Sequence, residues 1–211
     1  GAAIGAANFA KMINGSMSMH CNKIFFGHSQ LDFESALFQD MFCLEKSYIQ
    51  MDEMVDDLIS SGEIICCYFG GNEIGPRALC NRSIICAANN RQSVQALNLE
   101  IKKREGFRPL APVMLRSVAE TCFEINQKVC DCYRWMALTT MAKEKFPAEY
   151  QGVLHADRTA RVQILDDEMH PLYNFLERNS GKIDMLVNTS FNVAGDPIVF
   201  DAIDCYVNMS R

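Results

Sequence analysis

Several signatures of common enzyme and secretory classes are missing from this 211-residue chain. It has neither a G-x-x-x-x-G-K-[ST] phosphate loop nor a G-x-G-x-x-G dinucleotide motif, so neither motif can explain nucleotide binding here. No run approaches the ~20 apolar residues that a membrane-spanning helix requires. The first residues also lack the charged leader and long apolar run of a secretory signal. We therefore predict a protein that has no membrane partner.

Basic residues are scarce as well, because 20 Lys and Arg stand against 26 Asp and Glu and give a formal net charge of -6. A nucleic-acid-binding face is usually basic, so this balance argues against a nucleic-acid partner. The 4 histidines are scattered and no C-x-x-C pair occurs among the 10 cysteines, so we predict no metal site. Most cysteines lie in apolar runs such as IICCYF, where reduced thiols pack as small hydrophobes. Reduced thiols indicate a cytoplasmic location.

Apolar and periodic segments alternate along the chain. Patterns typical of strands, half-buried in the last case, occur at 64–69, 111–115, 184–192 and 161–165. Patterns typical of helices occur at 48–63, 89–105 and 170–182, with helix starts that resemble capping motifs at Ser117 and Asp201. This mixture predicts an α/β fold, with α+β as the alternative, in which ligand-binding groups lie at strand ends.

The stretch NEIGPRALCNRS (72–83) follows the first of these strands. Its Gly75-Pro76 turn has a fixed proline φ, which would hold Arg77 in a defined direction. Arg82 follows five residues later, and the arginine fork of donors suits phosphate or carboxylate. The alternative is a surface turn whose arginines are solvated, as exposed arginines usually are.

Three further polar motifs at strand or turn positions favour a binding site. They are KKREGFRPLAP with Lys102, Arg104 and Arg108, HADRTARVQ with His155 and Arg161, and VNTSFNVAGDP with Asn188, Ser190 and Asn192. Because three of the four motifs are cationic, the simplest common purpose is a site for a polyanion such as a nucleoside triphosphate. His155 has two interpretations, a general acid or base and a hydrogen-bonded structural residue.

Four segments together resemble the C-terminal region of the carbamoyltransferase family, which includes nodulation-type and antibiotic O-carbamoyltransferases. They are EIGPRALCNRSI, IKKREGFRPLAPVML, HADRTARVQIL and VNTSFNVAGDPIV, in that order, and the resemblance covers roughly residues 22–211. The opening GAAIGAA is similar to the end of the family's N-terminal domain, and the chain starts without Met, so we expect a piece of a longer enzyme.

The resemblance implies both an organisation and an activity. Residues 1–20 would be a remnant of the Kae1-like (ASKHA) domain, and residues 21–211 a YrdC-like domain, an open, twisted mixed sheet with flanking helices. In the family this domain makes carbamoyladenylate from carbamoyl phosphate and ATP, with Mg²⁺ accompanying the nucleotide. The N-terminal domain, which would be the partner of this chain, holds iron and transfers the carbamoyl group to an acceptor hydroxyl. We therefore expect a transferase fragment that does not complete the reaction alone.

The resemblance also implies residue roles. Arg77, Lys102 and Arg108 would be the catalytic cations around carbamoyl phosphate and the nucleotide phosphates. Substrate or nucleotide binding would fall to Arg82, Arg161, Asn188, Ser190 and Asn192. Cys80 and Arg158 stand where the family usually has glycine, which leaves open a non-catalytic nucleotide-binding or regulatory module. The resemblance leaves a second alternative, an RNA-binding module, because YrdC-like domains elsewhere act in tRNA modification.

Overall fold

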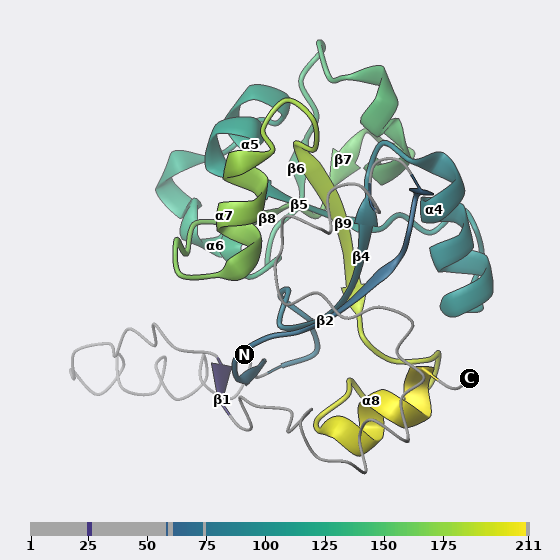
Figure 1. Ribbon diagram of the computed structural model, residues 1–211. Coiled ribbons are helices and arrows are strands. Elements are labelled where there is room, and N and C mark those ends of the chain that lie inside the picture. Colours follow the sequence, from purple (N-terminus) through teal and green to yellow (C-terminus); the bar gives the residue numbers. More distant parts are fainter. Residues whose placement is uncertain (1–24, 27–57, 59–60, 74, 210–211) are drawn as a thin grey trace, which may run out of the picture.

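A five-stranded mixed sheet forms the centre of the molecule (Figure 1). The computed structural model describes residues 25–26, 58, 61–73 and 75–209. In sheet order the strands are β2 (Ile65–Tyr68), β4 (Arg82–Ala87), β9 (Met185–Ser190), β5 (Ala111–Leu115) and β8 (Gln163–Leu165). The pair β5 and β8 is parallel, whereas the other neighbours are antiparallel. The predicted strands at 64–69, 111–115 and 184–192 are thus confirmed.

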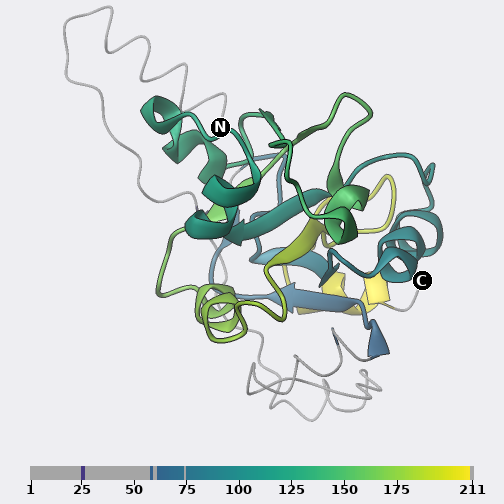
Figure 2. The same cartoon turned by 90° about the horizontal axis from the view of Figure 1, so that it is seen from above.

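Both faces of this sheet are covered, because successive side chains of a strand point to opposite faces. In β4, Ile85 joins a cluster with Leu172 and Phe175 of α7 (Pro171–Arg178). Its neighbours Ile84 and Cys86 join a second cluster on the other face. That second cluster is packed by α4 (Arg91–Ala96), η3 (Leu97–Ile101), α5 (Arg116–Cys122) and η5 (Ala148–Val153). Figure 2 shows helices on both sides of the sheet.

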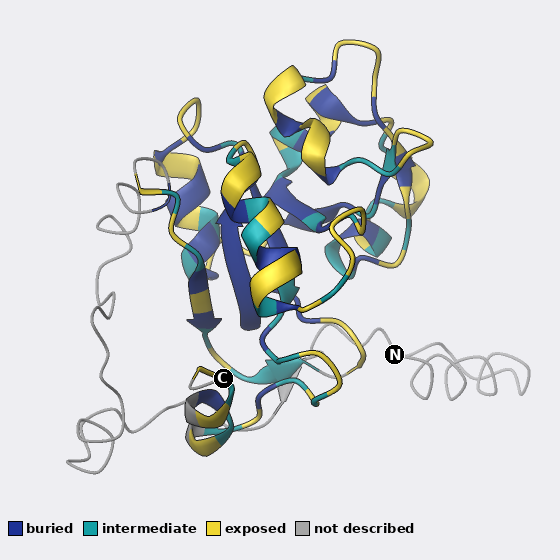
Figure 3. Cartoon of the chain, turned by 90° about the vertical axis from the view of Figure 1, so that its right-hand side faces the viewer, coloured by how far each residue is buried: buried dark blue, intermediate teal, exposed yellow. Residues whose placement is uncertain are grey.

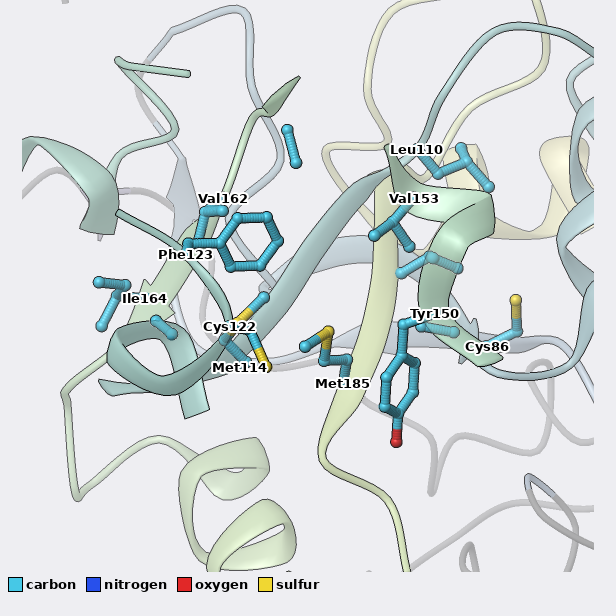
Figure 4. Close-up of a cluster of buried hydrophobic side chains, with 14 of the residues drawn as sticks. Cys86, Leu110, Met114, Cys122, Phe123, Tyr150, Val153, Val162, Ile164 and Met185 are labelled. Atoms are coloured by element: carbon cyan, nitrogen blue, oxygen red, sulfur yellow. The ribbon is translucent and has the colours of Figure 1, made fainter. Parts of the chain in front are cut away.

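Figure 4 shows part of the second cluster, in which Met114 and Met185 from two adjacent strands lie near Cys122 and Phe123. The ring of Phe123 also meets that of Phe146 edge-on, with 5.2 Å between centroids. Burial of the thiols is confirmed for most of the described cysteines, since Cys67, Cys80, Cys86, Cys122 and Cys205 are buried and unpaired by disulfides.

The smaller elements lie around the sheet edges. Two-stranded pairs join β1 (Phe25–Phe26) to β3 (Asn72–Glu73) and β6 (Thr140–Met141) to β7 (Thr159–Ala160). Short helices are η4 (Gln127–Val129), α6 (Asp131–Arg134) and α8 (Ala202–Met209). Figure 3 shows buried central strands and exposed outer helix faces. Within the described residues, no helix has the length and apolar character needed to cross a membrane.

Two predictions about element ends and one about burial need correction, and two others lie beyond the described residues. Ser117 lies inside α5 and caps nothing, because the helix starts one residue earlier after Leu115. The helix predicted at 89–105 ends at Ile101 in a π-helical turn. The strand predicted as half-buried at 161–165 is buried at each of its three residues, because both of its faces are covered. The boundary at residue 20 and most of the helix predicted at 48–63 fall outside the described residues.

Candidate functional site

A cavity of about 280 Å³ collects four cationic side chains from three segments that are distant in the sequence. Arg77 comes from the loop between β3 and β4, Lys102 and Arg104 follow η3, and Arg161 precedes β8. Asn188, Thr189 and Ser190 at the end of β9 complete its polar wall, and His155 also lines it. No Asp or Glu is among the described residues that line this cavity. Four cations without a carboxylate in the wall favour an anionic ligand.

Arg77 lies at an exposed position of its loop, after the predicted Gly75-Pro76 turn. Partial burial, together with the charge of Arg161, lowers the pKa of its guanidinium. An anion that binds between two guanidinium groups offsets their mutual repulsion and lowers their free energy. The loop is attached to the sheet by Asn188, whose Nδ2 donates a hydrogen bond to the Ala78 carbonyl at 3.0 Å.

Lys102 is only 6 % exposed, and its ammonium group donates to the turn that follows β9. Nζ lies 2.7 Å from both Oδ1 and the carbonyl oxygen of Asn192, and 2.9 Å from the Ser190 carbonyl oxygen. The hydroxyl of Ser190 in turn donates to Asn192 Oδ1. Burial and the neighbouring charge of Arg104 lower the pKa of Lys102 to about 8. The lysine therefore shapes the polar wall and places one positive charge behind it.

Arg104 is the cation of the 102–108 motif to which the sequence analysis assigned no role. Its Nε donates to Asn98 Oδ1 at 2.7 Å, which fixes the side chain against η3 beside the cavity. Burial and the charge of Arg108 lower its pKa. The run of three cations at 102–104 is the pattern that could have indicated it, because the turn after η3 brings Lys102 and Arg104 to one wall.

Arg108 lies elsewhere on the same turn. It is exposed and forms an ion pair with Glu105, with 2.7 Å between Nε and Oε2. It does not line the cavity that contains Arg77 and Lys102. The structure therefore brings together Arg77, Lys102, Arg161, Asn188 and Ser190 of the predicted site, and leaves Arg108 outside its wall.

Arg82 is fully buried and its guanidinium is used by the protein itself. Nη1 donates to the Phe69 carbonyl at 2.6 Å, and Nη2 donates to the Gly70 carbonyl at 3.1 Å. The guanidinium carbon lies 3.4 Å from the centroid of the Tyr68 ring, a cation–π contact. These contacts fix the turn after β2, and Arg82, which the sequence predicted to bind substrate, also lines the larger cavity described below.

Asn188 and Gln163 form a buried polar pair beneath the cavity. Asn188 Nδ2 donates to Gln163 Oε1 at 2.7 Å, so the two strands that flank β5 are joined at this level. The Oδ1 atom of Asn188 is buried with no hydrogen-bond partner in the protein. An unpaired buried acceptor is costly, so a donor supplied by a ligand or water would stabilise it.

A larger cavity of about 600 Å³ adjoins the cationic one, since Pro76 and Ser190 line both. Its wall combines the apolar side chains of Ile198, Val199 and Phe200 with the carboxylates of Glu73 and Asp196, and Arg82 also lines it. Asn192, another predicted ligand, lines this cavity and not the cationic one. The pair of cavities thus offers a cationic compartment next to a partly apolar one.

His155 is held by hydrogen bonds at the edge of the cationic cavity. Its Nδ1 lies 2.8 Å from Thr159 Oγ1, and that hydroxyl is 2.7 Å from Asp157 Oδ1. Because a carboxylate only accepts, the hydroxyl donates to Asp157 and accepts from Nδ1–H. This geometry favours the interpretation of His155 as a hydrogen-bonded structural residue, and it leaves Nε2 as the acceptor nitrogen of the ring.

Cys80 and Arg158, the two departures from the family's glycines, both adopt left-handed backbone angles, with φ of 79° and 64°. Only glycine adopts this conformation without a steric cost. Both turns therefore have the backbone geometry that suits glycine, the residue that the resemblance leads us to expect at these positions. Cys80 is fully buried, whereas Arg158 is exposed and donates from Nη2 to the Lys143 carbonyl at 3.1 Å.

Known proteins resemble this chain in sequence. The family model described as "Carbamoyltransferase C-terminus" matches residues 56–211. Nodulation protein NolO of Bradyrhizobium diazoefficiens is 33 % identical over 153 residues, which is 70 % of this chain and 27 % of that protein. The 3'-hydroxymethylcephem-O-carbamoyltransferase of Amycolatopsis lactamdurans is 32 % identical over 155 residues, which is 72 % of this chain and 28 % of the relative. The chain thus spans less than a third of the length of these relatives.

Solved structures extend the comparison to the fold. Full-length HypF in its phosphate- and nucleotide-bound form matches 78 % of this chain and 20 % of HypF, with a TM-score of 0.56 and 18 % identity. The H234A/Y235A variant of P. abyssi Sua5 matches 77 % of this chain and 47 % of Sua5, with a TM-score of 0.51 and 16 % identity. These matches confirm the predicted YrdC-like mixed sheet. The chain belongs to the carbamoyltransferase family and carries the C-terminal domain of that family.

Proposed function

We propose that this domain binds ATP and carbamoyl phosphate and forms carbamoyladenylate. The observation that carries the proposal is the cavity lined by Arg77, Lys102, Arg104 and Arg161 without a carboxylate in its wall. In the reaction, water releases phosphate from carbamoyl phosphate and leaves carbamate. A carbamate oxygen then attacks the α-phosphorus of ATP, and pyrophosphate leaves with the electrons of the broken P–O bond.

The two adjoining cavities suit chemically different parts of such a ligand. The phosphates occupy the cationic cavity, where fixed charges offset the repulsion between two polyanions and stabilise the leaving pyrophosphate. The nucleoside occupies the larger cavity, whose apolar wall suits a base and whose oxygen acceptors suit its amino and hydroxyl donors. Arg108 precedes Pro109, which lines the cationic cavity, and would exchange the Glu105 carboxylate for a phosphate when one arrives.

Neutral donors orient the small reactant. Asn188 and Ser190 lie at the end of β9, and the unpaired Oδ1 of Asn188 accepts from the carbamoyl amide. Magnesium would enter this site with the nucleotide, and the described residues contain no cluster of three metal-ligating side chains of their own. Magnesium held mainly by phosphates and water is typical of such sites, and it would neutralise charge on the triphosphate.

ATP–pyrophosphate exchange by the purified chain tests the proposal. Exchange that requires carbamoyl phosphate and is lost in Arg77→Ala is the expected result. Removal of one cation that acts in the transition state should cost on the order of 2.7–4 kcal/mol, or about a hundredfold or more in rate. ATP binding without exchange would favour a non-catalytic nucleotide-binding module, and a chain that binds no ATP would overturn the proposal.

A further inference from the structure

A chain of hydrogen bonds joins the start of α7 to the loop that carries Arg77. It runs from His170 through Asn81 to Glu73, and neither His170 nor Asn81 lines the two cavities. His170 and Asn81 are 8 % and 5 % exposed, so neither is available to a ligand from solvent. A role for these two side chains must therefore act through the residues they hold.

His170 is placed by both of its ring nitrogens. Nδ1 accepts from the backbone N–H of Leu172 at 3.2 Å, as the N-cap of α7. The ring proton is therefore on Nε2, which donates to Asn81 Oδ1 at 3.1 Å. The ring of Phe69 packs against the imidazole edge-on, with 5.6 Å between centroids, and restricts its rotation.

Asn81 connects His170 to both ends of the loop that carries Arg77. Its Nδ2 donates to the Gly71 carbonyl at 2.8 Å, before the loop, and its backbone N–H donates to Glu73 Oε1 at 2.9 Å. The same carboxylate oxygen accepts from the N–H of Leu79 at 2.7 Å, beyond Arg77. The Glu73 carboxylate thus bridges the two ends of the segment 73–79, and the hydrogen bonds of Asn81 support this bridge.

We propose that His170 is a positioning residue for Arg77, which it orients through Asn81 and the closed 73–81 loop. The inference rests on the proposed role of Arg77 as a phosphate ligand. Its physical basis is that Arg77 itself is exposed, so the direction of its side chain depends on the backbone that carries it. A loop that samples more conformations presents Arg77 in the binding geometry for a smaller fraction of the time and lowers the affinity accordingly.

The two nitrogens of His170 can be tested separately by two substitutions. His170→Asn keeps a side-chain oxygen that caps α7 but loses the reach to Asn81. His170→Gln keeps an amide that reaches Asn81 but loses the cap. We would measure the affinity for MgATP by calorimetry and the thermal unfolding midpoint for both variants, for Arg77→Ala, and for the His170→Asn/Arg77→Ala double variant.

We expect Arg77→Ala to weaken MgATP binding by about tenfold or more, and His170→Asn by about three- to tenfold, the effect of one lost hydrogen bond. His170→Gln should bind within about twofold of the wild type although it unfolds at a lower temperature than His170→Asn, because the lost cap costs about 1 kcal/mol. A purely structural role would instead make affinity and stability fall together. In the double variant the His170→Asn effect should vanish, since Arg77 is already absent.

The outcomes separate the inference from the proposed function. If Arg77→Ala binds MgATP normally, Arg77 is not a ligand and both fail. If Arg77→Ala is weakened but His170→Asn is not, or if the two losses add in the double variant, only the positioning role is refuted. Should His170→Asn not fold, Asn81→Ala removes the same connection while its backbone N–H still reaches Glu73, and the same comparison with Arg77→Ala applies.

Discussion

Lys102 makes a prediction that depends on its burial and can be checked by titration. Burial and Arg104 lower the pKa of its ammonium to about 8 in the free chain. A bound triphosphate would favour the charged form and raise that pKa, so binding near pH 8 takes up a proton. Because the pKa of Lys102 is lower in the free chain than in the complex, the affinity for MgATP is highest below pH 8 and falls as the pH rises above 8.

The magnitude follows from the pKa. The charged fraction of a group with a pKa of about 8 falls from roughly 90 % at pH 7 to roughly 10 % at pH 9. MgATP affinity should therefore fall by up to about tenfold over this range, which is about 1.4 kcal/mol. The arginines of the cavity stay charged throughout, and a terminal phosphate completes its ionisation near pH 6, so neither produces this trend.

Calorimetric titration with MgATP at pH 7, 8 and 9, in buffers of different ionisation enthalpy, would measure both affinity and proton uptake. About half a proton should be taken up at pH 8, and Lys102→Met should abolish both the uptake and the loss of affinity with pH. Lys103→Met is the matched control, because Lys103 is the adjacent but exposed lysine outside the cavity. A wild-type affinity that is constant from pH 7 to 9, or a pH dependence that survives in Lys102→Met, would refute the reasoning.

Three other predictions follow from single side chains. Arg104→Ala should weaken MgATP binding by about tenfold or more in the same calorimetric assay, because it removes one cavity cation; an unchanged affinity would exclude it from the site. Arg158→Gly should relieve a left-handed backbone cost of about 1 kcal/mol and raise the unfolding midpoint by roughly 1–4 °C, whereas Arg158→Ala should not. Burial lowers the pKa of His170 to about 4 from 6.5, so the unfolded chain gains a proton first as the pH falls below 6.5. The free energy of unfolding should then drop by about 2 kcal/mol between pH 7 and pH 5, and urea titrations of His170→Gln should show that this part of the drop is lost.

Local patterns predicted four of the five strands of the central sheet and missed β4. The apolar run at 111–115 is β5, and Pro171 occupies the first turn of α7 as expected. Element ends were harder, because the choice between Ser117 and Leu115 as the residue before α5 depends on where β5 must end. Half-burial of β8 was predicted wrongly because alternation within one strand does not reveal that a helix covers each face.

For the site, the sequence by itself determined the cations and polar residues of the four motifs. It also determined that they lie near strand ends, because residue type and local periodicity depend only on neighbouring positions in the chain. The tertiary structure decided which of these side chains meet. It brought Arg104 into the wall, left Arg108 paired with Glu105, and used Arg82 to bind the carbonyls of the turn after β2. The physical reason is that burial and hydrogen-bond partners come from segments far away in the chain: Asn81 and His170, for example, are 89 residues apart, yet one hydrogen bond joins them.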